Sequence, residues 1–310
     1  MKSMGWFFSV VVVAIVTSGC SMSKIGLRQT AGMAIQMQPV YEREPDLKLA
    51  ETALAANLKF LEGLVEIDPD NIDLLVATAR SFAQYGYGFA ESDVLSAEHS
   101  GDKMAEAEAG RRVIAIYDRS RLYGLRALSK IDPGFADAAS VDMSTFKNRL
   151  SLLSMDDLPA LYWTAFAWGN QLRLDADRPA RLAELSVVYA MMSRVLELDE
   201  TFRYGGAHLF MGAYYSVLPV FAGGPERARQ HFDIAIQISE GRYLLSKLAL
   251  VEYHYLRTGD TLLAREILAE IVQSDPTILP EQTLANQIAI QRARALLRKL
   301  QEPLAIDDSR

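Results

Sequence analysis

The side chains best suited to catalysis or metal binding do not form a recognisable set in this chain. The four histidines are His99, His208, His231 and His254, and none belongs to the His-x-x-x-His pair that a zinc site on a helix uses. The last three lie 23 residues apart each time, a spacing that matches no helical-repeat period. We interpret each histidine as a hydrogen-bonded helix residue, and we predict no metal site.

Motifs that cradle phosphates or position a nucleophile are also absent from the sequence. It contains no P-loop, no Gly-x-Gly-x-x-Gly fingerprint and no Gly-x-Ser-x-Gly elbow. Carboxylates are numerous, but Asp156 and Asp157 precede Leu158 and Pro159 at an expected helix start, where the helix dipole favours negative charge. The sequence therefore predicts no catalytic residues, no cofactor and no enzyme.

Cys20 is the only cysteine, and its surroundings predict lipid attachment. It follows the apolar run Trp6–Val16 and the small residues Thr17-Ser18-Gly19, as in a lipoprotein signal peptide, although Thr17 stands where leucine is usual. The run is shorter than the ~20 residues that span a hydrocarbon core. We predict that residues 1–19 are removed and that Cys20 is acylated. The alternative is an ordinary secretory signal with an incidental cysteine.

The charge of the chain excludes one class of partner and indicates a compartment. The formal net charge of -7 becomes -8 once Lys2 is removed, and no basic cluster stands out. Such a chain lacks the positive surface that binds phosphate backbones, so we expect no nucleic acid. Ser21 and Met22 follow the cysteine where an aspartate would favour retention, so we predict a periplasmic body anchored to the outer membrane. An inner-membrane anchor stays the alternative.

Helix-favouring residues, with apolar side chains three and four apart, predict that the chain after Cys20 is almost wholly helical. Four similar segments predict helix ends, since a residue before proline is pushed out of the α region. They are Glu66-Ile67-Asp68-Pro69, Lys130-Ile131-Asp132-Pro133, Gln273-Ser274-Asp275-Pro276 and the degenerate Glu197-Leu198-Asp199-Glu200. Their aspartates lie 64, 67 and 76 residues apart, and two of these intervals are near twice the 34-residue tetratricopeptide hairpin. We predict an all-α fold of tetratricopeptide-like hairpins stacked as an α-solenoid with terminal capping helices.

The predicted organisation has four parts. These are a signal peptide at 1–19, an acylated N-terminus and linker at 20–46, the helical repeat domain at 47–300, and a polar tail at 301–310. The expected helices are 47–67, 74–85, 103–130, 159–172, 180–198, 207–218, 226–239, 243–257, 262–273 and 281–300, the first and last of them as caps. Gly86 and Gly88 open a segment that departs from the repeat, so we predict a long connection at 86–101, either functional or a packing insertion.

Two clusters of aromatic and small residues stand out within the predicted helices. The first is Tyr162 to Gly169, and the second is Gly205 to Tyr215. In a helical stack such side chains either fill the core or line a groove, where an apolar body with a polar tip suits a ligand. Because Trp163 and Trp168 are five apart, at most one should face a groove. Our candidates for ligand or partner contact are Tyr162, Trp163, Trp168, His208, Tyr214 and Tyr215.

These two clusters also carry a resemblance to a known family. Tyr162-Trp163-Thr164-Ala165-Phe166-Ala167-Trp168-Gly169, the run from Ala207 to Pro219, and the pattern from Gly223 to Ile236 resemble the T-component of TRAP transporters, the TatT family. The likeness extends from about Leu47 to Leu300. The family usually has one more residue between Gly224 and Pro225, which predicts a slightly shorter loop here.

The resemblance implies a periplasmic lipoprotein of tetratricopeptide-like hairpins that assembles as a homotrimer. It also implies a TRAP solute-binding protein as partner, which is a carrier for organic acids or hydrophobic ligands. Two alternatives stay open. One is an envelope assembly scaffold that binds extended peptides of other proteins, and the other is direct binding of a small apolar ligand in the aromatic groove.

Overall fold

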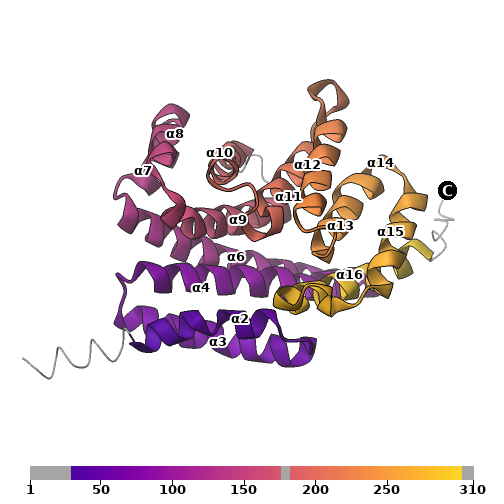
Figure 1. The fold of residues 1–310 in the computed structure, drawn as a ribbon, viewed down its shortest axis with the longest axis horizontal. Helices are drawn as coiled ribbons and strands as arrows, with labels where there is room; N and C mark the ends of the chain where they lie inside the picture. Colours follow the sequence, from indigo (N-terminus) through magenta and orange to yellow (C-terminus); the bar gives the residue numbers. More distant parts are fainter. Residues whose placement is uncertain (1–28, 176–181, 302–310) are drawn as a thin grey trace, which may run out of the picture.

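The computed structural model describes residues 29–175 and 182–301, and every element in these ranges is helical (Figure 1). The α-helices are α2 (Gln38–Glu42), α3 (Leu47–Ile67), α4 (Ile72–Tyr85), α5 (Glu91–Ser100), α6 (Lys103–Ile131), α7 (Phe135–Val141), α8 (Met143–Leu152), α9 (Leu158–Leu174), α10 (Leu182–Leu198), α11 (Phe202–Ser216), α12 (Gly224–Ile238), α13 (Leu244–Leu250), α14 (Leu256–Thr258), α15 (Thr261–Gln273) and α16 (Thr283–Gln301). The π-helical turns η1 (Gly86–Ala90) and η5 (Val251–Tyr255) continue α4 and α13. Short 3₁₀ turns are η2 (Met155–Asp157), η4 (Val220–Ala222), η6 (Pro276–Ile278) and η7 (Pro280–Gln282). The all-α prediction is confirmed.

The predicted helix ends are confirmed at all four aspartates. Three helices end directly before their aspartate, namely α3 at Ile67, α6 at Ile131 and α10 at Leu198. Helix α15 ends at Gln273, so that Ser274 lies between its end and Asp275. The first turn of a helix leaves backbone N–H groups without partners in the helix, and aspartates accept hydrogen bonds from several of them here. Asp102, for example, accepts hydrogen bonds from the amides of Met104 and Ala105 at the start of α6. Local side chains thus set where these helices begin and end.

The long connection predicted at 86–101 is wrong, because this segment forms η1 and α5. Its glycines suggested a loop, but they allow close packing instead. A Cβ on Gly88 would lie 2.7 Å from Cδ1 of Ile288, and one on Gly86 would lie 3.0 Å from the ring of Tyr117. The chain therefore stays helical through both glycines while α6 and α16 approach it closely.

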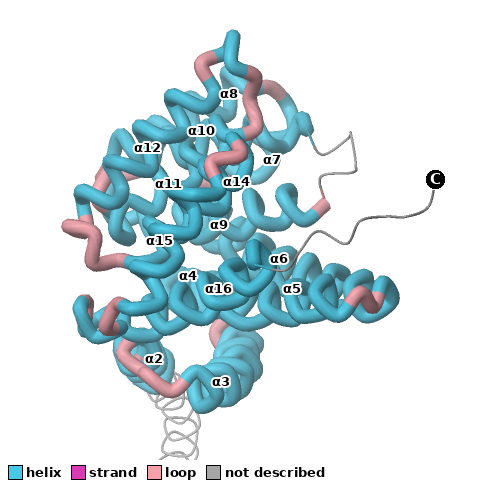
Figure 2. The backbone as a smooth tube through the Cα atoms, turned by 90° about the vertical axis from the view of Figure 1, so that its right-hand side faces the viewer, coloured by secondary structure: helices cyan, strands magenta, loops and turns pink. Residues whose placement is uncertain are grey.

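Successive helices pack against one another, and the last of them returns to the first. Contacts run from α3 through α4, α6, α9, α10, α11, α12, α13 and α15 to α16. Helix α16, expected as a cap over the last hairpin, also packs against α2 and α3. The two views place α2 and α3 at one side of the molecule and α8 and α10 at the other (Figures 1 and 2). The array of described helices thus closes on itself through α16, and residues from both of its ends border a central space.

Several expectations fall wholly or partly on residues that are not described. The signal peptide at 1–19, the acylation site Cys20 and the tail from 302 onward lie outside the described residues. Of the linker predicted at 20–46, residues 29–36 are helical and α2 follows them, so this part is packed structure. Among the helices in the described ranges, none is both long and apolar enough to cross a membrane.

The contact between α6 and α9 yields a stability prediction. A Cβ on Gly124 of α6 would lie 2.1 Å from Oγ1 and 3.2 Å from Cα of Thr164 on α9, so a side-chain rotation cannot relieve the clash. We expect Gly124→Ala to lower the free energy of unfolding by about 1–3 kcal/mol, measured by urea denaturation. Gly110→Ala, in the same helix with nothing within 4 Å, is the matched control and should raise it by about 0.5–1 kcal/mol. Equal effects of the two substitutions would contradict close packing at Gly124.

Candidate functional site

The central space is a cavity of about 600 Å³ with a largely apolar wall. Side chains from α3, η1, α11, α13 and α16 form much of this wall. They include Leu54, Phe89, Leu209, Ala249, Leu284 and Ile288. A cavity of this size and character is typical of small-molecule binding sites.

Both π-helical turns contribute to the cavity. Tyr87 and Phe89 of η1 line it, as does Tyr253 of η5. A π-helical turn inserts an extra residue into a helix and redirects the side chains around it, and such turns are frequent at functional sites. Here each turn lies where a helix faces the cavity, so the change of period supplies aromatic rings to the wall.

An aromatic cluster on α9 forms another part of the wall. Tyr162 lies edge-on to Trp163 with ring centroids 5.0 Å apart, and Trp163 lies 5.7 Å from Phe166. Gly206 of α11 permits the contact between the two helices, since a Cβ there would lie 2.3 Å from the hydroxyl of Tyr162. Burial raises the pKa of Tyr162, so this hydroxyl stays neutral.

The structure brings only half of the predicted candidates into the cavity wall. Tyr162, Trp163 and Tyr214 line it. Trp168 lies elsewhere, where its Nε1 donates to Glu184 at 2.7 Å and the guanidinium of Arg121 lies 5.1 Å from its ring centroid. The divergence of Trp163 and Trp168 follows from their spacing of five residues on one helix.

His208 and Tyr215 belong to a separate cluster between α11 and α12. Nδ1 of His208 lies 2.9 Å from Nδ1 of His231, and the ring of Tyr215 stacks on His231 at 5.5 Å. Burial lowers the pKa of both histidines, that of His231 to about 4, with a further contribution from His208. The pair is therefore neutral near pH 7, and one ring donates its Nδ1–H to Nδ1 of the other. The 23-residue spacing, which matched no repeat, corresponds to one crossing of this hairpin.

A polar cluster that we name the Glu42 cluster borders the cavity, with Glu42, Gln84, Arg203 and Gln282 in the wall and Arg80 outside the lining. Oε1 of Glu42 accepts hydrogen bonds from Arg80 at 2.5 Å, Gln84 at 2.8 Å and Arg203 at 2.9 Å, and Oε2 accepts one from Gln282 at 3.2 Å. Burial raises the pKa of Glu42, but the two guanidinium groups outweigh this effect and hold it below its usual value. Glu42 is thus an ionised carboxylate within a largely apolar surface.

A left-handed turn at the start of α11 positions Arg203 in this cluster. Arg203, Tyr204 and Gly205 have φ values of 51°, 58° and 75°. Left-handed backbone costs a non-glycine residue roughly 1–2 kcal/mol, so the surrounding contacts must compensate for it. Tyr204 stacks on Tyr243 at 4.9 Å, and the guanidinium of Arg203 lies 5.4 Å from the ring centroid of Trp163.

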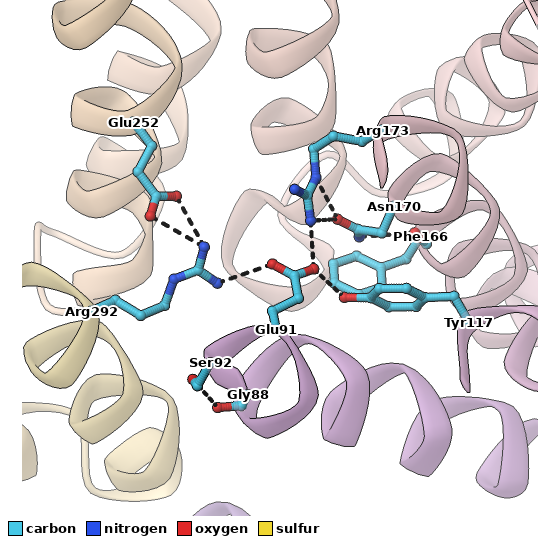
Figure 3. A network of polar contacts seen from close by, with 9 residues as sticks. All are labelled: Gly88, Glu91, Ser92, Tyr117, Phe166, Asn170, Arg173, Glu252 and Arg292. Atoms are coloured by element: carbon cyan, nitrogen blue, oxygen red, sulfur yellow. Dashed lines mark hydrogen bonds and ion pairs between the residues drawn. The ribbon is translucent and has the colours of Figure 1, made fainter. Parts of the chain in front are cut away.

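A second network, the Glu91 cluster, joins three distant parts of the chain (Figure 3). Glu91 of α5 accepts from the hydroxyl of Tyr117 at 2.6 Å and from Arg173 at 2.5 Å, and it pairs with Arg292 at 3.5 Å. Arg292 also pairs with Glu252 at 3.2 Å. Arg173 lines the cavity, whereas Arg292 is 6% exposed and lies over the ring of Tyr87.

This arrangement can hold an apolar molecule beside charged and polar groups. The described residues contain no group of three or more histidine, cysteine, aspartate or glutamate side chains that could hold a metal ion. Sequence reasoning missed Glu42, Arg80, Arg203 and Arg173. Each is an isolated charged residue on a helix, and only the closing of the helical array brings Glu42, Arg203 and Arg173 to one cavity and Arg80 to Glu42.

Comparison with known families decides the classification. Residues 43–303 match the family model described as the TRAP transporter T-component. The chain belongs to this family. The match confirms the relationship predicted from the two aromatic clusters, and the family is a transport accessory component rather than an enzyme class. A search among curated proteins gave no match. As a T-component, the chain is associated with a TRAP transport system.

The Glu91 cluster yields a prediction about the stability of this T-component. Removing Arg292 leaves Glu91 and Glu252 short of a buried cation, and breaking a buried pair costs about 3–5 kcal/mol. We expect Arg292→Met to lower the free energy of unfolding by this amount in chemical denaturation. Arg294→Met, at an exposed position of the same helix, is the matched control and should change it by about 0.5 kcal/mol or less. Similar values for both variants would show that the network contributes little.

Proposed function

We propose that this T-component is a periplasmic lipoprotein that docks the solute-binding protein of its TRAP system. Membership of the family supports a role in such a system. The apolar run before Cys20 supports export and acylation, and outer-membrane anchoring follows from Ser21 and Met22. The absence of a catalytic set from the sequence supports an accessory role rather than an enzymatic one.

We further propose that the central cavity receives the transported solute or a related molecule. Protein interiors are close-packed, and voids larger than a water molecule are few. A cavity of about 600 Å³, bordered by aromatic rings and two polar clusters, therefore supports a ligand role. This cavity is the single observation that carries the proposal beyond family membership.

The finer architecture is also a proposal. Helix pairs such as α4 with α6 and α11 with α12 pack as neighbours, which supports tetratricopeptide-like hairpins. Homotrimer formation rests on the family resemblance alone. The envelope scaffold remains the alternative function, and it differs in requiring a surface for extended peptides.

Docking is tested with the solute-binding protein encoded with this chain. We expect the two purified proteins to form a saturable complex in isothermal titration calorimetry. The control is a solute-binding protein from a TRAP system that has no T-component, which should not bind. Absence of any complex would contradict docking. Equal binding of unstructured peptides, together with an envelope defect and normal solute uptake on depletion, would instead support the scaffold.

The lipid anchor is tested by Cys20→Ser. Because Cys20 is the only thiol, its loss removes the acylation site without touching the described helices. We expect the variant to move from the membrane fraction to the soluble periplasmic fraction with an unchanged circular dichroism melting curve. Cys20→Ser that stays with the membrane would refute lipid attachment.

A further inference from the structure

The Glu42 cluster, which is mostly in the cavity wall, and the Glu91 cluster, which reaches the wall through Arg173, differ in charge balance. The Glu91 cluster has two carboxylates, Glu91 and Glu252, and two guanidinium groups, Arg173 and Arg292. The Glu42 cluster has two guanidinium groups but one carboxylate. Within the described residues, the ion-pair partner of both Arg80 and Arg203 is Glu42. One positive charge in the Glu42 cluster is therefore not balanced by an acidic side chain.

This unbalanced charge lies where a buried cation is costly. The side chains of Arg80 and Arg203 are 23% and 18% exposed, and that of Glu42 is 12% exposed. Burial lowers the pKa of Arg80, and repulsion by the nearby Arg203 lowers it further. Nε of Arg80 is buried without a hydrogen-bond partner. Buried charges in proteins are normally paired, so the cluster is short of one anion.

The neighbouring groups fit a carboxylate with an apolar body. Arg203 lines the cavity and carries five N–H donors, and its hydrogen bonds to Glu42 and to Oε1 of Gln282 both come from Nη2. Both guanidinium groups lie near the ring of Trp163, that of Arg80 at 5.9 Å and that of Arg203 at 5.4 Å from its centroid. Beyond these groups the wall is largely apolar, and the guanidinium of Arg173, which also lines it, is paired with Glu91. An amphipathic molecule with one carboxylate satisfies both parts.

The carboxylate of Glu42 lies just outside the region that the family model matches. Glu42 is the last residue of α2, and the match begins at the next residue. Helix α2 is held by Gln38, which is 2% exposed and donates to Oγ of Ser81 at 3.1 Å. Helix α2, which lies outside the matched region, therefore supplies one of the two negative charges that would balance the two arginines.

We propose that Arg203, which lines the cavity and shares Glu42 with Arg80, is the headgroup site for an amphipathic monocarboxylate, which binds beside Glu42 and brings the cluster to the two-to-two balance of the Glu91 cluster. This inference rests on the proposed ligand role of the cavity. The ligand's carboxylate takes the donors of Arg203 that Glu42 does not use, and its apolar chain extends along the wall formed by Leu209, Leu245 and Ile288.

The test compares decanoate with decanol on the full folded chain. Both probes displace a neutral fluorescent reporter, N-phenyl-1-naphthylamine, and they differ only in the headgroup. Because hydrogen bonds to charged groups contribute about 1.5–3 kcal/mol, we expect decanoate to bind about tenfold or more tightly than decanol. Arg203→Gln should abolish this preference while leaving decanol binding unchanged. The Arg203→Gln substitution leaves one negative charge, on Glu42, opposite one positive charge, on Arg80. We therefore expect the variant to remain folded, which a melting curve measures.

Glu42→Gln provides a second, opposite readout. Removing the carboxylate removes its repulsion toward the ligand, so we expect tighter binding of decanoate and no change for decanol. A purely structural role for Glu42 would weaken both probes together. Equal affinities of decanoate and decanol in the unmodified protein would overturn the headgroup site and leave the cavity's ligand role intact. Failure of the reporter and both probes to bind would overturn both, and docking of the solute-binding protein would still be measured separately.

Discussion

The structure depends on the pairing of buried charges that come from distant helices. A carboxylate removed from water is stable only if cations and hydrogen-bond donors replace its hydration. Glu91 obtains them from Tyr117, from Arg173, which is 82 residues away, and from Arg292, which is 201 residues away. These partners can meet only when α16 returns to the first half of the chain. The pairing therefore joins the two ends of the helical array around the cavity.

Close backbone approach makes the same closure possible at other points. Gly88 allows α16 to approach η1, Gly124 allows α9 to approach α6, and Gly206 leaves room for the hydroxyl of Tyr162. At Gly88 and Gly124 the helix continues through the glycine, so these residues serve packing between helices rather than a turn. Small residues at these points let the walls meet tightly while the larger aromatic side chains border the cavity.

The sequence and the structure agree where local physics is sufficient. The helix ends at Asp68, Asp132, Asp199 and Asp275 were predictable, because proline and aspartate act on the nearest turn. The connection expected at 86–101 was not, because Gly86 and Gly88 are equally compatible with a loop and with a helix under close contact. Only the positions of Tyr117 and Ile288, contributed by α6 and α16, distinguish the two.

The candidate site shows the same division. From the sequence alone came the aromatic clusters on 162–169 and 205–215, the family, and an expected lipid anchor at Cys20. The tertiary structure decided that Tyr162, Trp163 and Tyr214 face the cavity, while Trp168, His208 and Tyr215 make contacts elsewhere. It also decided that Glu42, Arg80 and Arg203 meet, although 161 residues separate the first from the last. Helical period and turn residues are local properties that a sequence displays directly. Which charged side chains share a buried surface depends on how many helices close on one another, and no single segment contains that information.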